Sequence, residues 1–250
     1  MKNVLLIFFL FSLTGVVAQP VERLKYELRY GFIKGGTAVL KASNTVYENK
    51  PSIHYHLEGK TVGLADKLFS VHDIYESTVN PETFLPYKAI RNIKERKYRY
   101  YNEAFFFHDN DSIFSQRSGG RKVPPNLVDM LSAFFYLRHN HYLDKLDKGE
   151  EFKIPVFHAD KEFVMVAKYL GTEKISTKIG EIECHIVSPY VDKGKLLKRS
   201  DGLKFYITKD ANRIPLLLEF DMNIGALKCE LKSYKQYSEQ HGNKPYELEF

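Results

Sequence analysis

The chain has 250 residues, of which 44% are hydrophobic, and 37 Lys and Arg against 31 Asp and Glu give it a formal net charge of +6. This mild surplus, with both signs mixed along the chain, favours an anionic partner such as a lipid headgroup or acidic glycan without requiring one. The sequence has no Pro/Gly/Ser-rich linker, low-complexity tract or internal repeat, which excludes a repeat protein and predicts one domain over residues 19–250.

The first residues indicate export. "MKNVLLIFFLFSLTGVVAQP" has a charged start at Lys2, an apolar run over 4–13 and a small-residue exit at Ala18. This pattern predicts a secretory signal peptide over residues 1–18, because the run is shorter than the roughly 20 residues that span a bilayer. A buried N-terminal strand or an uncleaved anchor are the alternatives. We therefore expect an exported, periplasmic or envelope-associated protein with no transmembrane segment in the mature chain.

Strand patterns follow the leader. In "SIHYHLEGKTV", Ile53, Tyr55 and Leu57 alternate with His54 and polar residues. "TAVLKASN", "LKFYITK" and "IPLLLEFDM" alternate in the same way, whereas "EFVMVAKYL" is apolar on both faces. Period-two alternation predicts a sheet with one dry and one wet face, and the Gly, Pro, Asn and Asp residues between the runs predict antiparallel hairpins. "GLADKLFS" over 63–70 predicts a short helical turn.

The stretch "NIKERKYRYYNEAFFFHD" over 92–109 interleaves basic residues and tyrosines. Export removes the usual nucleic-acid partners, so we expect no nucleic acid despite the similarity to single-strand binding surfaces. As one continuous strand, the stretch would place Lys94, Arg96, Tyr98 and Tyr100 on a common face. We predict that these four residues line a groove for an anionic amphiphile or glycan. The alternative is a solvated edge strand whose charges discourage aggregation.

One segment is clearly helical. "NLVDMLSAFFYLRHN" has apolar residues at helical spacing, Asn126 can cap it, and Pro124 and Pro125 prevent an earlier start. We expect a helix at about 126–140 that packs against a sheet. The fold class is therefore mainly β: a strongly curved antiparallel meander or incomplete barrel with this helix at its centre. A two-sheet sandwich is the alternative.

The two cysteines lie in strand patterns, each on the apolar face. In an oxidising compartment, Cys184 and Cys229 could form a buried disulfide between two strands. The alternative is two separate thiols that behave as small hydrophobic residues. The chain has no Cys-x-x-Cys pair, so redox catalysis is not expected.

No other constellation predicts chemistry. His54 and His56 share a strand face, and His139 and His141 follow the helix, but neither pair has a third metal ligand in the sequence pattern. Nucleophile and phosphate-binding motifs are absent from the sequence. Carboxylates that could pair for glycoside cleavage are Asp73, Glu76, Asp109 and Asp111. We expect no metal, no cofactor and no catalytic residue.

Several segments in order resemble an exported bacterial family. They are "GFIKGGTA", "GLADKLFSVHDIYES", "KERKYRYYN", "LVDMLSAFFYLR", "GEIECHIVSP" and "DGLKFYITKDANRIP". The set is similar to the domain of unknown function 3108 (DUF3108), and it covers most of the mature chain. The family typically has Trp where this chain has Tyr206. The resemblance implies an envelope-located β-rich protein, similar to half-barrel periplasmic folds, and it implies no reaction.

These features together predict a non-catalytic envelope protein that binds or carries an amphiphile or glycan in a curved sheet. A structural or assembly partner of another envelope protein is a second hypothesis. A hydrolase of envelope polymers is a third, and it requires paired carboxylates in a cleft.

Overall fold

A single curved sheet forms most of the molecule. The computed structural model describes residues 20–139, 142–190, 202–223, 225–237 and 246–250, so the expected leader lies outside the described residues. Within this part of the chain, sixteen strands belong to one sheet. No helix in these ranges is long and apolar enough to cross a membrane.

The elements alternate between long hairpin strands and short turns. The N-terminal half contains β1 (Pro20–Tyr30), β2 (Ile33–Tyr47), β3 (Lys50–Thr61), α1 (Gly63–Leu68), β4 (His72–Val79), β5 (Pro86–Glu95), β6 (Tyr98–Phe107), η1 (His108–Asn110), β7 (Ser112–Ser115) and β8 (Gly119–Lys122). The C-terminal half contains β9 (Val128–Asp129), α2 (Met130–His139), η2 (Tyr142–Lys145), β10 (Glu151–His158), β11 (Lys161–Thr177), β12 (Gly180–Pro189), β13 (Leu203–Thr208), β14 (Pro215–Asp221), β15 (Ala226–Gln236) and β16 (Tyr246–Glu249).

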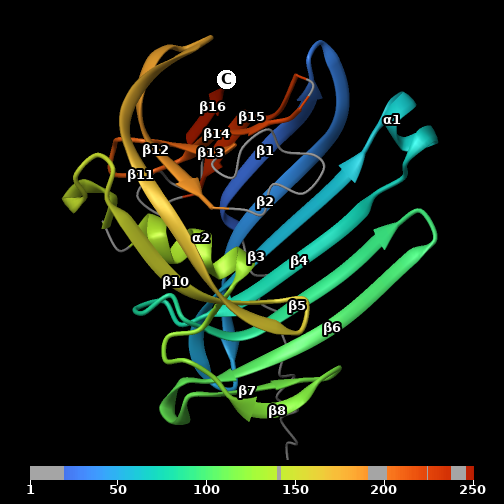
Figure 1. The fold of residues 1–250 in the computed structure, drawn as a ribbon, viewed down its shortest axis with the longest axis vertical. Coiled ribbons are helices and arrows are strands. Elements are labelled where there is room, and N and C mark those ends of the chain that lie inside the picture. The colour runs from blue at the N-terminus through green and yellow to red at the C-terminus, as the bar shows by residue number, and fades with distance from the viewer. Residues whose placement is uncertain (1–19, 140–141, 191–201, 224, 238–245) are drawn as a thin grey trace, which may run out of the picture.

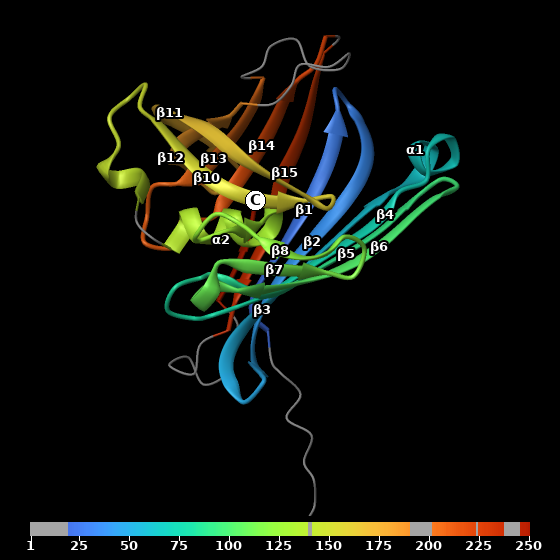
Figure 2. The same ribbon diagram turned by 60° about the horizontal axis from the view of Figure 1, so that its bottom comes forward.

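The sheet has a meander order that confirms the predicted fold class. Its strands run β8-β7-β6-β5-β4-β3-β2-β1-β15-β14-β13-β12-β11-β10-β9, with β16 on β15. The pairing of β1 with β15 joins the two halves, and the short β9–β10 pair is parallel. Because strand twist accumulates across so many strands, the sheet curls around α2 (Figures 1 and 2). The two-sheet sandwich does not form, and α1 confirms the helical turn predicted at 63–70.

Helix α2 lies inside the curve of the sheet (Figures 1 and 2) and has apolar side chains on more than one side. Leu131 and Phe135 pack into a cluster with inward side chains of β1–β3, β14 and β15. The rings of Phe135 and Tyr55 are stacked with centroids 3.5 Å apart. Ala133 and Leu137 pack on the opposite side, against side chains of β10 and β11. The helix is thus held between the two walls of the curled sheet.

The helix begins later than the sequence indicated. Asn126 adopts a left-handed conformation with φ of 57°, and Val128 and Asp129 form a strand pair with β10. The Asp129 carboxylate accepts hydrogen bonds from the backbone N–H of Leu131 at 2.8 Å and of Ser132 at 3.2 Å. Asp129 is therefore the N-cap, and the prediction of a start at Asn126 was wrong by four residues. The predicted end at 140 lies outside the described residues.

A buried ion pair fixes the C-terminal half of α2 to β1. The Arg138 guanidinium donates two hydrogen bonds to the Glu22 carboxylate, at 2.6 and 2.7 Å. Its Nε donates a third to the Asn212 carbonyl at 2.9 Å. Both side chains are buried, and the bidentate geometry offsets part of the cost of removing two charges from water.

Both cysteines are free thiols. Cys184 lies on β12 and Cys229 on β15, and β13 and β14 lie between those strands in the sheet. Neighbouring strands are about 4.8 Å apart, so three steps exceed the roughly 7 Å limit between Cα atoms for a disulfide. The disulfide that the sequence left open is not formed, and the alternative of two separate thiols describes the structure.

Candidate functional site

An apolar cleft of about 350 Å³ lies between α2 and the concave face of the sheet. Helix α2 contributes Met130, Leu131 and Phe134 to its lining. The strands contribute the inward-facing side chains of their alternating sequences, among them Leu28, Ala38, Leu57, Leu218 and Phe220. The volume falls in the range of roughly 300–1,000 Å³ that is usual for small-molecule sites.

The cleft lies beside α2, toward one end of the strands. The turns β1–β2 and β5–β6 and helix α1 all lie at one end of the sheet (Figures 1 and 2). With the exception of Pro215, each strand residue that lines the cleft lies at the middle of its strand or nearer to this end. The cleft is therefore a space with α2 as its floor and sheet strands as its walls.

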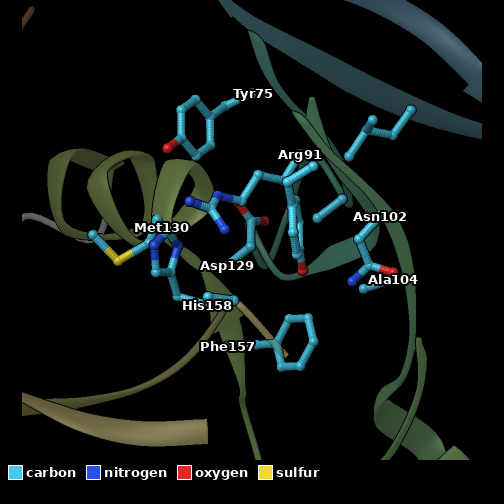
Figure 3. Close-up of a pocket in the computed structure, with 12 residues that line it drawn as sticks. Tyr75, Arg91, Asn102, Ala104, Asp129, Met130, Phe157 and His158 are labelled. Carbon is cyan, nitrogen blue, oxygen red and sulfur yellow. The ribbon is translucent and has the colours of Figure 1, made fainter. Parts of the chain in front are cut away.

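Arg91 stands in a small pocket beside this cleft. The pocket has a volume of about 30 Å³, the room of about one water molecule, and we call it the Arg91 pocket. Tyr75, Met130 and His158 line both spaces. In Figure 3 the Arg91 side chain extends toward the start of α2, with Tyr75 on one side and His158 on the other. The cleft and the Arg91 pocket are therefore neighbours, separated by these three side chains.

The guanidinium of Arg91 has ring faces as neighbours and lacks a carboxylate partner. It lies 4.7 Å from the ring centroid of Tyr100 and 5.9 Å from that of Tyr75. Its Nε is buried without a hydrogen-bond partner, and no described residue forms an ion pair with it. The side chain is half-buried, and hydrogen bonds with Tyr75 and Tyr100 favour its charged form. Because the guanidinium has tyrosine partners and no anionic one among the described residues, it is suited to an anionic ligand.

The other ionisable groups of the pocket do not neutralise Arg91. Burial, and then the nearby positive charge of Arg91, lower the pKa of His158 below its ordinary value, so its imidazole is neutral near pH 7. The Asp129 carboxylate accepts hydrogen bonds from the hydroxyls of Ser77 at 2.7 Å and Ser132 at 2.6 Å. Burial raises the pKa of Asp129, although these hydrogen bonds oppose the change.

Hydrogen bonds to Asp160 connect the β10–β11 turn to β6 and β7 beside the pocket. We call Asp160 and its partners Tyr100, Asn102 and Ser115 the latch. Asp160, in the β10–β11 turn, accepts hydrogen bonds from Tyr100 Oη at 2.6 Å and Asn102 Nδ2 at 3.0 Å, both on β6. It also accepts one from Ser115 Oγ on β7 at 2.6 Å. Arg121 of β8 pairs with Glu162 of β11 at 2.6 Å. The two ends of the open sheet are therefore joined by side chains here, and Asp160 is the centre of the latch.

The structure separates the four residues that the sequence placed in one groove. A turn at Arg96 and Lys97, with φ of 48° at Arg96, divides the stretch into β5 and β6. Because Lys94 pairs with Arg99 and Ile93 with Tyr100, Lys94 faces away from Tyr100. Tyr100 lines the Arg91 pocket, whereas Lys94, Arg96 and Tyr98 are exposed at the hairpin tip. The prediction of one continuous strand over 92–101 was wrong, and a groove shared by the four residues does not form.

The remaining candidates from the sequence lie away from the cleft. His54 contacts the Glu76 carboxylate at 3.1 Å and Thr78 Oγ1 at 3.1 Å. Among the described residues, no group of three or more His, Cys, Asp or Glu could hold a metal ion. The second member of the His139–His141 pair lies outside the described residues, and His139 stacks on Phe84. None of the four carboxylates Asp73, Glu76, Asp109 and Asp111 lines the cleft.

Arg91 itself was missed in the sequence, although a signal for it was present. In the alternating pattern of β5, Arg91 lies on the same face as Ala89 and Ile93, and both of these pack into apolar clusters or are buried. An arginine between two inward-facing apolar residues must be paired or solvated in the interior. Its neighbours Tyr75, Tyr100 and His158 come from three other strands, so no local motif marks the site.

Comparisons with known proteins support the fold and assign no function. The family described as "Protein of unknown function (DUF3108)" matches residues 25–232. No curated protein matches the chain. A solved β-barrel-like protein of the DUF1849 family from Brucella abortus is similar, with a TM-score of 0.57 and 10% identity over 88% of this chain and 98% of that one. A DUF1089 family protein from Pseudomonas aeruginosa has a TM-score of 0.35 and 9% identity over 83% of this chain and 94% of that one.

Proposed function

We propose that this chain, which belongs to the DUF3108 family of proteins of unknown function, binds an anionic amphiphile in the cleft between α2 and the sheet. The apolar part of the ligand lies between α2 and the strands, and its acidic head approaches Arg91. The chain acts as a binding or carrier protein of the cell envelope and performs no reaction on the ligand. Export is inferred from the leader over residues 1–18.

The observation that carries this proposal is an arginine without an anionic partner in a pocket that adjoins an apolar cleft. The cleft walls are mostly carbon, and Tyr75, Met130 and His158 belong both to them and to the pocket of Arg91. Burial of a hydrocarbon chain is favourable by about 0.8 kcal/mol for each CH₂ group. A carboxylate or phosphate that reaches the guanidinium adds charge-assisted hydrogen bonds. An acidic amphiphile has both the hydrocarbon chain and the anionic head that these two contacts require.

A glycan fits the cleft less well than an amphiphile does. Sugar hydroxyls need polar partners once they leave water, and the cleft offers mainly the apolar side chains of Leu28, Ala38, Leu57, Phe134 and Phe220. The aliphatic chain of an amphiphile needs none. Of the two ligand classes that the sequence suggested, we therefore propose an amphiphile and not a glycan.

Calorimetric titration with dodecanoate below its micelle concentration tests the proposal. We expect saturable binding to the wild type, and no binding to Ala38→Phe, because the added ring fills the cleft. Val39→Phe is the matched control: residue 39 is next in the chain and faces the other side of β2. Circular dichroism must show that both variants are folded.

Either of two results would contradict the proposal. One is a wild type that takes up no dodecanoate at any concentration below the micelle point. The other is a folded Ala38→Phe that binds as tightly as Val39→Phe. Dodecyltrimethylammonium, which has the same chain and the opposite charge, should bind more weakly than dodecanoate if Arg91 meets the head.

A further inference from the structure

Three segments far apart in the sequence form one end of the sheet. They are residues 27–34 around the β1–β2 turn, residues 60–70 around α1, and residues 94–99 around the β5–β6 turn. Both ribbon views place them together, at the side where α1 projects (Figures 1 and 2). We call these 25 residues the rim.

Backbone hydrogen bonds hold the rim as one surface. Val62 N–H donates to the Gly35 carbonyl at 3.0 Å, which joins α1 to β2. Arg96 N–H donates to the Ser70 carbonyl at 2.7 Å, which joins the segment after α1 to the β5–β6 turn. The Arg96 guanidinium lies 5.7 Å from the ring centroid of Phe69. The rim side chains are therefore presented by a preorganised scaffold.

The rim exposes large apolar side chains at its tips. It holds seven of the sixteen exposed large hydrophobic residues found in the described part of the chain, although it is one tenth of the sequence. Phe32, at the tip of the β1–β2 turn, is 97% exposed, and Leu64 and Leu68 of α1 are 65% and 69% exposed. Apolar residues concentrated in this way are typical of an interaction surface.

The same segments contain most of the net charge of the protein. They include eight Lys and Arg and three Asp and Glu, a surplus of five positive charges, whereas the whole chain has +6. The basic residues are Arg29, Lys34, Lys60, Lys67, Lys94, Arg96, Lys97 and Arg99. One of the acids, Glu27, is already paired with Arg29 and Lys34. The rim thus combines protruding apolar tips with a basic surround.

We propose that the rim docks onto the surface of an anionic lipid bilayer. Phe32, Leu64 and Leu68 enter the headgroup layer, and the surrounding Lys and Arg meet anionic headgroups. A folded protein partner is a poorer fit, because the apolar residues stand on separate tips that can enter a soft layer. Since the cleft lining lies toward the same end of the strands, docking would also bring the cleft close to a source of amphiphiles.

Vesicle co-sedimentation tests this proposal on protein purified without residues 1–18, so that the apolar leader contributes nothing. The probes are vesicles of pure phosphatidylcholine and of three parts phosphatidylcholine to one part phosphatidylglycerol. We expect binding to the anionic vesicles that weakens with added salt, and at least about tenfold weaker binding to the neutral ones.

Two double variants separate the apolar and basic contributions. Phe32→Ser with Leu68→Ser, and Lys67→Glu with Lys97→Glu, should each lower the affinity for anionic vesicles at least about tenfold. The apolar control is Val46→Ser with Phe107→Ser, two exposed residues at the opposite strand ends. The charge control is Lys145→Glu with Lys148→Glu, beside the η2–β10 connection across the molecule from α1.

Dodecanoate binding measured on the same variants shows that they are folded and that the cleft is intact. Rim variants that bind vesicles as tightly as their controls would overturn the proposal, as would a wild type that binds neither vesicle. Loss of vesicle binding with dodecanoate binding unchanged supports it. Because none of the four substituted rim residues lines the cleft, this proposal and the proposed function can fail separately.

Discussion

Two arginines, Arg138 and Arg91, lie inside the curve of the same sheet. Arg138, on α2, is bound by the Glu22 carboxylate and the Asn212 carbonyl. Arg91, on β5, faces the rings of Tyr100 and Tyr75 in the pocket that adjoins the cleft. Arg138 has a carboxylate partner within the fold, whereas the partners of Arg91 are tyrosines. We therefore assign a structural role to Arg138 and propose a binding role for Arg91.

The largest expected effect is the loss of stability when the ion pair of Arg138 with Glu22 is broken. Glu22→Gln removes the charge that Arg138 requires and leaves a buried cation. We expect a loss of about 3–5 kcal/mol in the free energy of unfolding, measured by urea denaturation followed by circular dichroism. Glu181→Gln, which breaks an exposed pair with Lys174, should cost less than about 1 kcal/mol. Equal losses for the two variants would show that Arg138 is not structural.

Arg91→Met should weaken ligand binding strongly and change the stability of the fold only slightly. We expect the free energy of unfolding to fall by only about 1 kcal/mol, because Arg91 is half-buried and its removal breaks hydrogen bonds with tyrosines but no ion pair. Affinity for dodecanoate should fall about tenfold to a hundredfold, because a charge-assisted hydrogen bond contributes about 1.5–3 kcal/mol. Lys94→Gln, on the outer face of the same strand, is the control in the same titration and should bind like the wild type. A strongly destabilised Arg91→Met with normal binding would reverse the roles given to the two arginines.

The latch provides a smaller effect with a defined dependence on pH. Burial alone would raise the pKa of Asp160, but hydrogen bonds from Ser115, Tyr100 and Ser118 hold it below its ordinary value of 3.8. A carboxyl whose pKa is lowered in the folded state stabilises that state above pH 3.8 and loses this contribution as the pH falls through the folded pKa.

Asp160→Asn keeps the shape of the side chain and removes its charge. We expect it to cost about 1 kcal/mol at neutral pH, with the difference from the wild type shrinking as the solution is acidified. Thermal denaturation at several pH values measures this. A difference between the two proteins that grows on acidification would contradict the role given to the latch.

Much of the fold could be predicted because it depends on local patterns. The alternation of Ile53, Tyr55 and Leu57 predicted an inward face, and Tyr55 is 1% exposed. The helix was predicted from its apolar spacing, but its start was misplaced because Asn126 and Asp129 are both capping residues. Only the tertiary pairing of β9 with β10 decides between them.

The site could be predicted only in part, because it depends on contacts between distant strands. The Arg96–Lys97 turn has no Gly, Pro, Asn or Asp to mark it, so the sequence suggested one strand and placed Lys94 beside Tyr100. Tyr100 faces a pocket without the other three residues of the predicted groove, and its partner Asp160 lies 60 residues away. The basic residues of the hairpin tip were recognised, but their apolar neighbours on α1 and the β1–β2 turn come together only in the folded sheet.

The most direct test of the account uses the methionines of the protein as reporters. Met130 lines both the cleft and the Arg91 pocket, whereas Met165 lies against the core cluster of β10 and β11. With methyl-¹³C methionine, titration with dodecanoate should shift the Met130 signal in a saturable way and leave the Met165 signal in place. Saturable binding by calorimetry without any change at Met130 would contradict the claim that the cleft against α2 is the binding site.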